Sequence, residues 1–396
     1  MPAGVSPFGA AFTPQRRDSS RAITDRLAST PRLCVKPGYP DTPVTTTTEK
    51  PLLILLAQVL PNRVAAIERL AAEISIEVVD LANDVPHGGG LARLPDSVPQ
   101  VDATTWEIPK LIRSGRYGAV MIETQGPTSF SLAAFSTHRA GLPLIVWVGL
   151  QEVPGTLRWR VGRRILRRVF RWSSAVLSYG EPQSRLAASL GAETVVTSMD
   201  PVDLDFWTTP VSMSRGDGLK FLFAGRQEIE KGPHILLDAW RRSGLADQGA
   251  TLRMIGDGTW SPDGGYPAGI SVQHSVAREE MREVYAASDV LVVPSITTRT
   301  FKEPWGIVVA EAMCQGLAVV SSDSVGAALG GLATDGETAL VVPEGDAAAL
   351  AQAMERLAGD EALRLRLAAA GRERVEDFKP GIWVDDLKKA VEIAVA

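Results

Sequence analysis

The stretch FKEPWGIVVAEAMCQGLAVV, Phe301–Val320, decides the fold, because it combines a loop, a helix and a strand. A helix is predicted over Gly306–Met313, with Pro304 in its first turn and Gly316 at its C-cap. The apolar run DVLVVPS lies just before this stretch, and the run LAVVSSD forms its end. Two apolar runs joined by a helix predict neighbouring parallel strands covered on both faces.

The same alternation extends in both directions along the chain. The strand-like runs are LLILLAQVL, IEVVDL, GAVMIET, LPLIVWV, SSAVLSY and ETVVTS, followed by LKFLFAG, TLRMIGDG, ISVQH, DVLVVPS, LAVVSSD and ALVVPEGD. A polar, turn-rich segment, Pro201–Gly218, separates the two series. We therefore expect an α/β protein with two doubly wound parallel-sheet domains, whose ligands lie at the carboxyl ends of the strands in a cleft.

Composition excludes several classes of protein. The chain has 396 residues, 45% of them hydrophobic, and a formal net charge of -5, which does not favour nucleic-acid binding. Its two cysteines, Cys34 and Cys314, predict neither a disulfide framework nor a zinc site, and they favour a reducing cytosol. The chain contains no apolar run as long as a membrane span, and residues 1–50 read as a disordered tail.

The loop and helix of the deciding stretch can hold an anion and its attached sugars. A helix entered from a loop offers free backbone N–H groups and a positive dipole end, which suit a diphosphate. Glu303 can reach hydroxyls of a donor sugar, and Glu311 can accept two hydrogen bonds from a ribose diol. Neither carboxylate needs a shifted pKa for this role. The alternative is an ordinary helix charge and a solvated glutamate.

A second stretch, FLFAGRQEIEKGPHILLDAW, places two cations after a strand. The strand is expected to end at Gly225, with Arg226 and Lys231 on the loop that leads to the next helix. Two cations at this position can neutralise a diphosphate that gains charge as its sugar leaves. Taken alone they could equally be surface charges, so their weight comes from the pairing with the glutamate segment.

These motifs occur in an ordered series that resembles retaining glycosyltransferase family 4, also called glycosyl transferases group 1. The series runs from about Leu219 to Phe378 and consists of AGRQEIEKG, MIGDG, VQHSVAREEMREVYAASDVLVVPS, EPWGIVVAEAM and ALVVPEGDAAALAQAM. The resemblance implies the GT-B fold, in which two Rossmann-like domains face a cleft. The implied organisation is a tail at 1–50, an acceptor-binding domain at 51–207, a nucleotide-sugar domain at 208–378 and a returning helix at 379–396.

The resemblance also implies a role for each donor-site residue. Arg226 and Lys231 bind the diphosphate and, with Glu303, carry catalysis, whereas Glu311 binds the ribose. Backbone groups of Trp305, Gly306 and Ile307 meet the sugar and phosphates, and the base lies near Val272. The donor is a substrate, so neither a cofactor nor a metal is expected.

The N-terminal half resembles the family less closely. Arg63 matches the usual opening of the first helix, but Asn62 stands where a tyrosine is usual, and the common glycine-rich loop and central histidine are missing. The candidates for the acceptor side are Glu123, Gln125, Trp147 and Glu152. HGGG at 87–90 is interpreted as a loop, and DLD at 203–205 as structural rather than metal-binding.

The segment RWRVGRRILRRVFRWSS contains seven arginines among aromatic and aliphatic residues. On a helix, Arg158–Trp172 has a cationic side and an apolar side, and three interpretations stay open. The helix can contact an anionic membrane at its cytoplasmic face, it can be packed on the core with a solvated basic side, or it can bind an acidic acceptor.

We therefore predict a cytoplasmic, metal-independent, retaining hexosyltransferase-type enzyme. Its acceptor is a glycan, a lipid-linked intermediate or a small natural product. One alternative is another GT-B enzyme, such as a nucleotide-sugar epimerase, which would act on the donor without an acceptor. A non-enzymatic nucleotide-sugar-binding scaffold is the other, although the presence of both cations and both glutamates argues against it.

Overall fold

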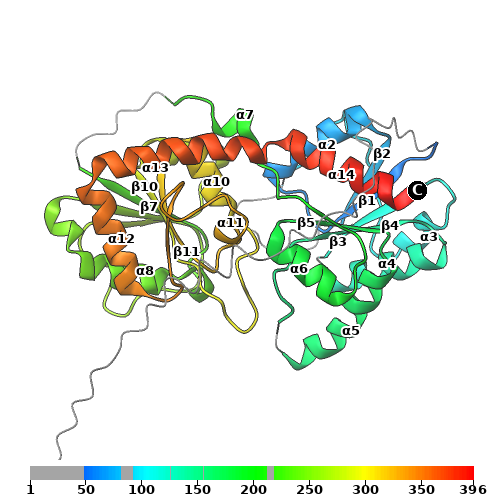
Figure 1. Ribbon diagram of the computed structural model, residues 1–396, viewed down its shortest axis with the longest axis horizontal. Coiled ribbons are helices and arrows are strands. Elements are labelled where there is room, and N and C mark those ends of the chain that lie inside the picture. Colours follow the sequence, from blue (N-terminus) through cyan, green and yellow to red (C-terminus); the bar gives the residue numbers. More distant parts are fainter. Residues whose placement is uncertain (1–48, 82–91, 125, 155, 212–217) are drawn as a thin grey trace, which may run out of the picture. The chain divides into compact units, whose positions relative to one another are not determined.

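The computed structural model describes residues 49–81, 92–124, 126–154, 156–211 and 218–396. Within these residues the chain forms two six-stranded sheets, all of whose pairings are parallel (Figure 1). Each of the twelve strand-like runs in the sequence contains one of the strands. The expectation of doubly wound parallel sheets is confirmed.

The first sheet has the strand order β2-β1-β3-β4-β5-β6. Its strands are β1 (Leu52–Leu56), β2 (Ile76–Asp80), β3 (Ala119–Glu123), β4 (Leu144–Val148), β5 (Ala175–Ser178) and β6 (Val195–Thr197). The helices in this part are α2 (Pro61–Glu73), α3 (Ile108–Ile112), α4 (Pro127–Arg139), α5 (Leu157–Trp172), α6 (Glu181–Leu190) and α7 (Leu204–Trp207).

The second sheet has the order β12-β11-β10-β7-β8-β9. Its strands are β7 (Lys220–Ala224), β8 (Thr251–Ile255), β9 (Ile270–Gln273), β10 (Val290–Val293), β11 (Ala318–Ser322) and β12 (Leu340–Val342). The helices that accompany it are η1 (Ile229–Lys231), α8 (Pro233–Ser243), η2 (Leu245–Gln248), α9 (Arg278–Ala286), α10 (Ile307–Cys314), α11 (Gly326–Leu329), α12 (Ala347–Gly359), α13 (Glu361–Arg374) and η3 (Val375–Phe378). The last helix, α14 (Pro380–Val395), packs against α2 and the strands of the first sheet.

Burial on both faces explains why the central strands are apolar without interruption. Along β1, Leu52 and Ile54 point into one hydrophobic cluster, whereas Leu53 and Leu55 point into another on the opposite face. Such a strand has no solvent-facing side, so the alternation of an amphipathic strand is lost. The first of these clusters also contains Leu222 of β7 and Trp383 of α14, and α14 packs against α2 (Figure 1).

The start of α10 differs from the prediction. The helix begins at Ile307, and Gly306 is its N-cap residue with a φ of 82°. Pro304 therefore lies before the helix instead of in its first turn. Gly316, with a φ of 75°, follows the C-cap residue Gln315, which is the usual place for a left-handed residue.

One fully buried arginine ties the first sheet together. The Arg63 guanidinium, on α2, pairs with the carboxylates of Glu123 at 2.8 Å and Asp200 at 3.1 Å. It also donates to the Tyr179 hydroxyl and lies 4.3 Å from the centre of the Trp147 ring. Burial by itself lowers the pKa of Arg63, but Asp200 and Glu123 together raise that pKa above its ordinary value. The guanidinium therefore stays charged, and both carboxylates have a counter-ion.

We predict that Arg63→Ala lowers the free energy of unfolding by about 3–5 kcal/mol, because it leaves two buried carboxylates without their counter-ion. Urea denaturation of the whole chain measures this loss. Arg185→Ala is the matched control, since Arg185 is exposed and pairs with Glu181 at 3.9 Å. The control should change stability by less than about 1 kcal/mol, and an equal loss in both variants would contradict the role given to Arg63.

Candidate active site

Lys231, on the loop after β7, and Glu303, in the segment before α10, are in contact. The Lys231 amine forms an ion pair with the Glu303 carboxylate, and the Ser295 hydroxyl donates to the same carboxylate oxygen at 3.2 Å. The Lys231 nitrogen also lies 4.9 Å from the centre of the Phe301 ring. Glu303 is buried. The site thus holds a cation and an anion side by side, both fixed by further contacts.

Backbone geometry fixes the loop that carries Lys231. Gly232 has a φ of 72°, and a Cβ at this position would lie 2.0 Å from the carbonyl oxygen of Pro294. Only glycine fits so close to another backbone. The N–H of Ile296 donates to the carbonyl oxygen of Glu230 at 2.9 Å. The loop after β7 is therefore clamped to the loop after β10, which contains Ser295.

Arg226 has a different immediate partner. Its guanidinium pairs with the Glu230 carboxylate at 3.1 Å, and its side chain is partly exposed. Gly256 and Gly258, on the turn after β8, pack against the backbone of the Arg226 loop, because a Cβ at either would lie within 2.2 Å of its atoms. The backbone at Arg226 is therefore fixed, whereas its partly exposed side chain can exchange Glu230 for a ligand.

The segment before α10 is held by its carbonyl oxygens. The N–H groups of Gly326 and Ala327 donate to the oxygens of Glu303 and Trp305, at 3.1 and 2.6 Å. Gln183 donates to the oxygen of Pro304 at 2.8 Å, and Gln151 donates to the oxygen of Glu303. No side chain caps the N-terminus of α10 at Gly306. Uncapped amides at a helix N-terminus are available to bind an anion, and phosphate binding by Gly306 and Ile307 stays a prediction.

The Trp305 side chain packs in the core. Its indole ring is buried and packs on Phe378 with the ring centres 5.4 Å apart. A Cβ at Gly330 would lie 2.8 Å from the same indole ring. The side chain therefore anchors the segment to the core.

Glu311 lies on α10 itself and is half-buried. It accepts a hydrogen bond from the Tyr285 hydroxyl at 2.9 Å. Burial raises the pKa of the Glu311 carboxyl to about 7, and the Tyr285 hydrogen bond and the charge of Arg278 oppose this rise. The role of an acceptor does not require this shift, and the sequence does not reveal it, because the sequence does not show how much protein surrounds the carboxyl group.

The proposed base region is open. Val272 of β9 is 41% exposed, which is high for an aliphatic residue in a strand. The His274 ring nitrogen Nδ1 lies 2.7 Å from the Asp257 carboxylate, and both side chains are exposed. Val272 thus provides an apolar surface at the end of the sheet where the loops carrying Arg226 and Lys231 also lie.

Of the acceptor-side candidates, Glu123 and Trp147 lie side by side in the first sheet, whereas Glu152 lies apart from them. Glu123 is buried in the ion pair with Arg63, and Trp147 is buried between Arg63 and Trp383. Gln125 lies outside the described residues. Glu152 is exposed and lines a cavity of about 90 Å³ together with residues of the Lys231–Glu303 neighbourhood, among them Phe301 and Pro304.

Sequence reasoning missed three residues that position the site: Gln151, Gln183 and Ser295. A glutamine or serine by itself gives no signal of such a contact in the sequence. Gln151 and Gln183 contact backbone oxygens, and Ser295 contacts the Glu303 carboxylate. Gln183 and Ser295 are almost completely buried, and burial is not visible in the sequence.

The DLD motif lies outside the site. Asp203, the start of DLD, caps α7 and pairs with Arg278 at 2.7 Å, which is the structural role predicted for it. HGGG at 87–90 lies outside the described residues. Among the described residues, no three side chains of His, Cys, Asp or Glu gather as they do around a metal ion.

Comparison with known proteins places this geometry in a family. Residues 209–374 match the family described as "Glycosyl transferases group 1". A phosphatidyl-myo-inositol mannosyltransferase of Mycobacterium leprae is 33% identical over 180 residues, which are 44% of this chain and 46% of that protein. A glycogen synthase of Mycobacterium tuberculosis is 29% identical over 202 residues, 48% of this chain and 46% of that protein. The chain thus spans about half the length of the curated relatives it matches.

Solved structures agree over most of the chain. Anabaena Alr3699/HepE in complex with UDP and glucose has a TM-score of 0.66 at 16% identity, covering 87% of this chain and 99% of that one. TarM has a TM-score of 0.67 at 9% identity, covering 89% of this chain and 100% of that one. Likenesses at such identities concern the fold. Residues 209–374 thus match the glycosyl transferases group 1 family, and the two parallel sheets have the GT-B fold.

Proposed function

We propose that this protein transfers a sugar from a nucleotide-diphosphate sugar to an acceptor hydroxyl, with retention of configuration at the sugar's anomeric carbon. The observation that carries the proposal is the Lys231–Glu303 pair beside the uncapped N-terminus of α10. A cation and helix amides suit a diphosphate, and a carboxylate next to them suits the hydroxyls of the sugar attached to it.

The two cations divide the charge of the departing diphosphate. Lys231 already lies at the site, whereas Arg226 must exchange Glu230 for phosphate oxygens. Both side chains stabilise a leaving group whose negative charge grows as the bond to the sugar breaks. Glu311 binds the ribose, and the base lies on the open surface around Val272. The donor is consumed as a substrate, so the reaction as proposed needs neither a cofactor nor a metal.

The bond changes follow from retention. The acceptor hydroxyl attacks from the face that the diphosphate leaves, so that the old carbon–oxygen bond breaks as the new one forms. A donor phosphate oxygen takes the hydroxyl proton. Closure of the two domains would exclude water, which otherwise competes with the acceptor.

The acceptor side rests on fewer contacts. Glu152 and Gln151 line the cavity next to Pro304, so this is where the acceptor is proposed to enter. A glycan, a lipid-linked intermediate and a small natural product remain the proposed acceptor classes. No helix among the described residues is long and apolar enough to cross a membrane. The proposed location is the cytoplasm, with peripheral contact to the inner face of the membrane through α5.

We predict that Glu303→Gln and Lys231→Met affect different ligands. A thermal-shift panel of UDP-, GDP-, ADP- and TDP-sugars first identifies the donor, since a ligand that binds the folded state raises the melting temperature. Titration calorimetry then compares this donor with its nucleoside diphosphate. Glu303→Gln should weaken the donor about tenfold relative to the diphosphate, because it removes a charged hydrogen-bond acceptor for the sugar.

Lys231→Met should weaken both ligands, since both carry the diphosphate. Glu337→Gln, an exposed change in the same domain, is the control and should alter neither affinity. Equal weakening of both ligands by Glu303→Gln would remove Glu303 from the sugar site. Failure of all four nucleotide sugars to stabilise the protein would contradict the proposed function.

A second prediction concerns pH. Ribose hydroxyls bind best to an ionised Glu311, and the carboxyl gains its proton as pH falls through about 7. Donor affinity should therefore fall roughly tenfold from pH 8 to pH 6, in step with the ionised fraction. The diphosphate of a nucleotide sugar does not titrate in this range. Glu311→Gln should show weaker binding with a flat pH profile, and identical profiles in both proteins would refute the ribose assignment.

A further inference from the structure

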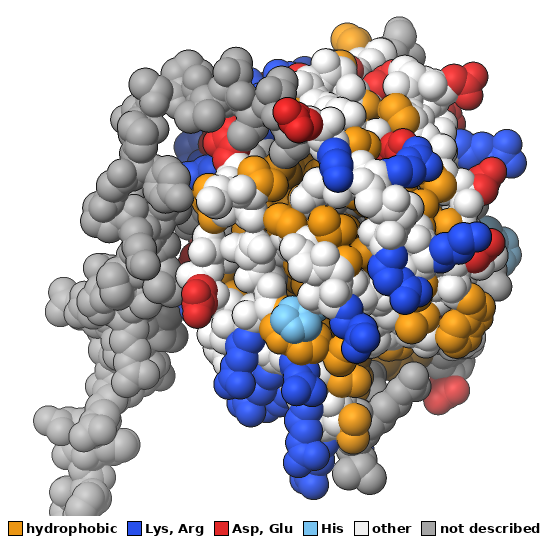
Figure 2. All heavy atoms as spheres, turned by 90° about the vertical axis from the view of Figure 1, so that its right-hand side faces the viewer, with side chains coloured by type: hydrophobic (Ala, Val, Ile, Leu, Met, Phe, Trp, Pro, Cys, Tyr) orange, Lys and Arg blue, Asp and Glu red, His pale blue; other side chains and the backbone are white. Residues whose placement is uncertain are grey.

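The exposed side of α5 is an unusually dense array of arginines. Leu166, Val169 and Phe170 of this helix are buried in the core of the first sheet. Its apolar side is therefore already used inside the protein and is not available to enter a bilayer. The exposed residues that remain include Arg160, Arg163, Arg164, Arg167, Arg168 and Arg171. Lysine and arginine side chains gather along the lower edge of this part of the molecule (Figure 2).

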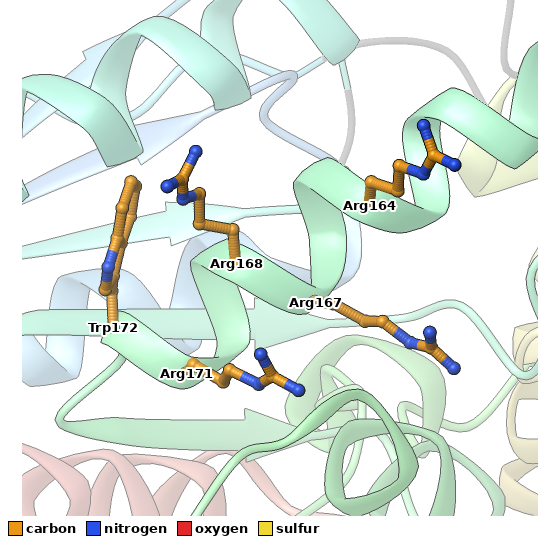
Figure 3. Close-up of a pocket in the computed structure, with 5 residues that line it drawn as sticks. All are labelled: Arg164, Arg167, Arg168, Arg171 and Trp172. Carbon is orange, nitrogen blue, oxygen red and sulfur yellow. The ribbon is translucent and has the colours of Figure 1, made fainter.

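Five of the side chains on α5 line one hollow of about 480 Å³. Arg164, Arg168 and Trp172 follow one another at intervals of four residues, and Arg167 and Arg171 form a second row beside them (Figure 3). Residues four apart on a helix lie about 6 Å apart along its axis and on the same side. The hollow is thus bounded by two short rows of guanidinium groups.

These arginines repel one another, and no acidic side chain on the described part of α5 offsets the repulsion. Like charges four residues apart destabilise a helix by about 0.2–0.5 kcal/mol for each pair. Some exposed helical arginines elsewhere on the protein have acidic partners four residues away, as in Arg69–Glu73 and Arg242–Asp238. Among the described residues, no carboxylate pairs with an exposed arginine of α5. A bound anion would relieve this repulsion.

A rigid aromatic wall closes one end of the hollow. The Trp172 ring stacks on His138 of α4, with ring centres 3.9 Å apart and planes at 8°. Phe135 meets Trp172 edge-on at 5.0 Å, and the Arg168 guanidinium lies 5.4 Å from the centre of the Trp172 ring. Trp172 and Arg168 are thus held in place before any ligand arrives, which lowers the entropic cost of binding.

We infer that Arg164, Arg167, Arg168, Arg171 and Trp172 form a binding site for a ligand with two or more neighbouring phosphate groups. Two N–H groups of a guanidinium match two oxygens of a phosphate. The four positive charges of these arginines exceed the negative charge of a single phosphate group. The phosphates can belong to a lipid headgroup or to a soluble molecule. This site is separate from the donor site, whose residues lie on the second domain, and the inference does not depend on sugar transfer.

Titration calorimetry of the whole protein with inositol hexakisphosphate, a soluble polyphosphate, tests the site. Two double variants, Arg164→Gln with Arg168→Gln and Arg167→Gln with Arg171→Gln, should each weaken binding about tenfold or more, with unchanged circular dichroism. Arg241→Gln with Arg242→Gln removes the same charge from the end of α8 and should leave binding unchanged. Lys231→Met, in the donor site, should also leave it unchanged.

Vesicle sedimentation identifies the source of the phosphates. Phosphatidylcholine vesicles carry either phosphatidylinositol 4-phosphate or phosphatidylglycerol, at equal total charge. Preference for the phosphorylated headgroup supports a lipid ligand, whereas binding of the soluble probe without vesicle binding supports a soluble one. Absence of saturable binding by the native protein would overturn the inference. Equal weakening by the α8 control would do the same, because it would indicate an effect of net charge alone.

Discussion

The turn Glu303–Gly306 is the constraint on which the rest of the site depends. Its carbonyl oxygens at 303, 304 and 305 accept hydrogen bonds from Gly326, Gln183 and Ala327. A Cβ at Gly326 would lie 2.0 Å from the oxygen of Pro304, so this contact exists only with glycine. With its oxygens fixed from behind, the turn has its amides at the start of α10 directed away from them, and the Glu303 side chain reaches Lys231. The backbone contacts of the turn therefore determine where the Glu303 carboxylate and the Lys231 amine meet.

The two domains use charge in different ways. In the first, Arg63 is wholly enclosed between Glu123, Asp200 and Trp147, and it links α2 to the segment that leads out of the sheet. In the second, Lys231 and Arg226 are only partly covered and can change partners. A buried pair is costly to break and suits a framework, whereas a partly exposed pair suits a ligand site. Gln151 and Gln183 link the two domains, because their side chains donate hydrogen bonds from the first domain to the backbone of the turn.

The sequence predicts the strands, and it fails where a distant partner decides how a side chain is placed. Each strand was visible because burial on both faces leaves a continuous apolar run, as in β4 and β10. The ion pair of Lys231 with Glu303 joins residues from two motifs to which the family resemblance gives one ligand. Glu123 and Trp147 are predicted on the acceptor side because they lie at the ends of strands. Their partner Arg63 lies 60 or more positions away in the sequence, and both side chains are buried against it. Likewise, the raised pKa of Glu311 depends on surrounding atoms that no motif encodes.

The central claim is that a nucleotide diphosphate lies between the cations and the start of α10. A crystal structure of the protein with the nucleoside diphosphate of its donor tests this most directly. The account predicts phosphate oxygens within hydrogen-bond distance of Lys231, Arg226 and the amides of Gly306 and Ile307, with the Arg226–Glu230 pair broken. A diphosphate bound elsewhere, with the Arg226–Glu230 pair intact and the start of α10 unoccupied, would contradict it.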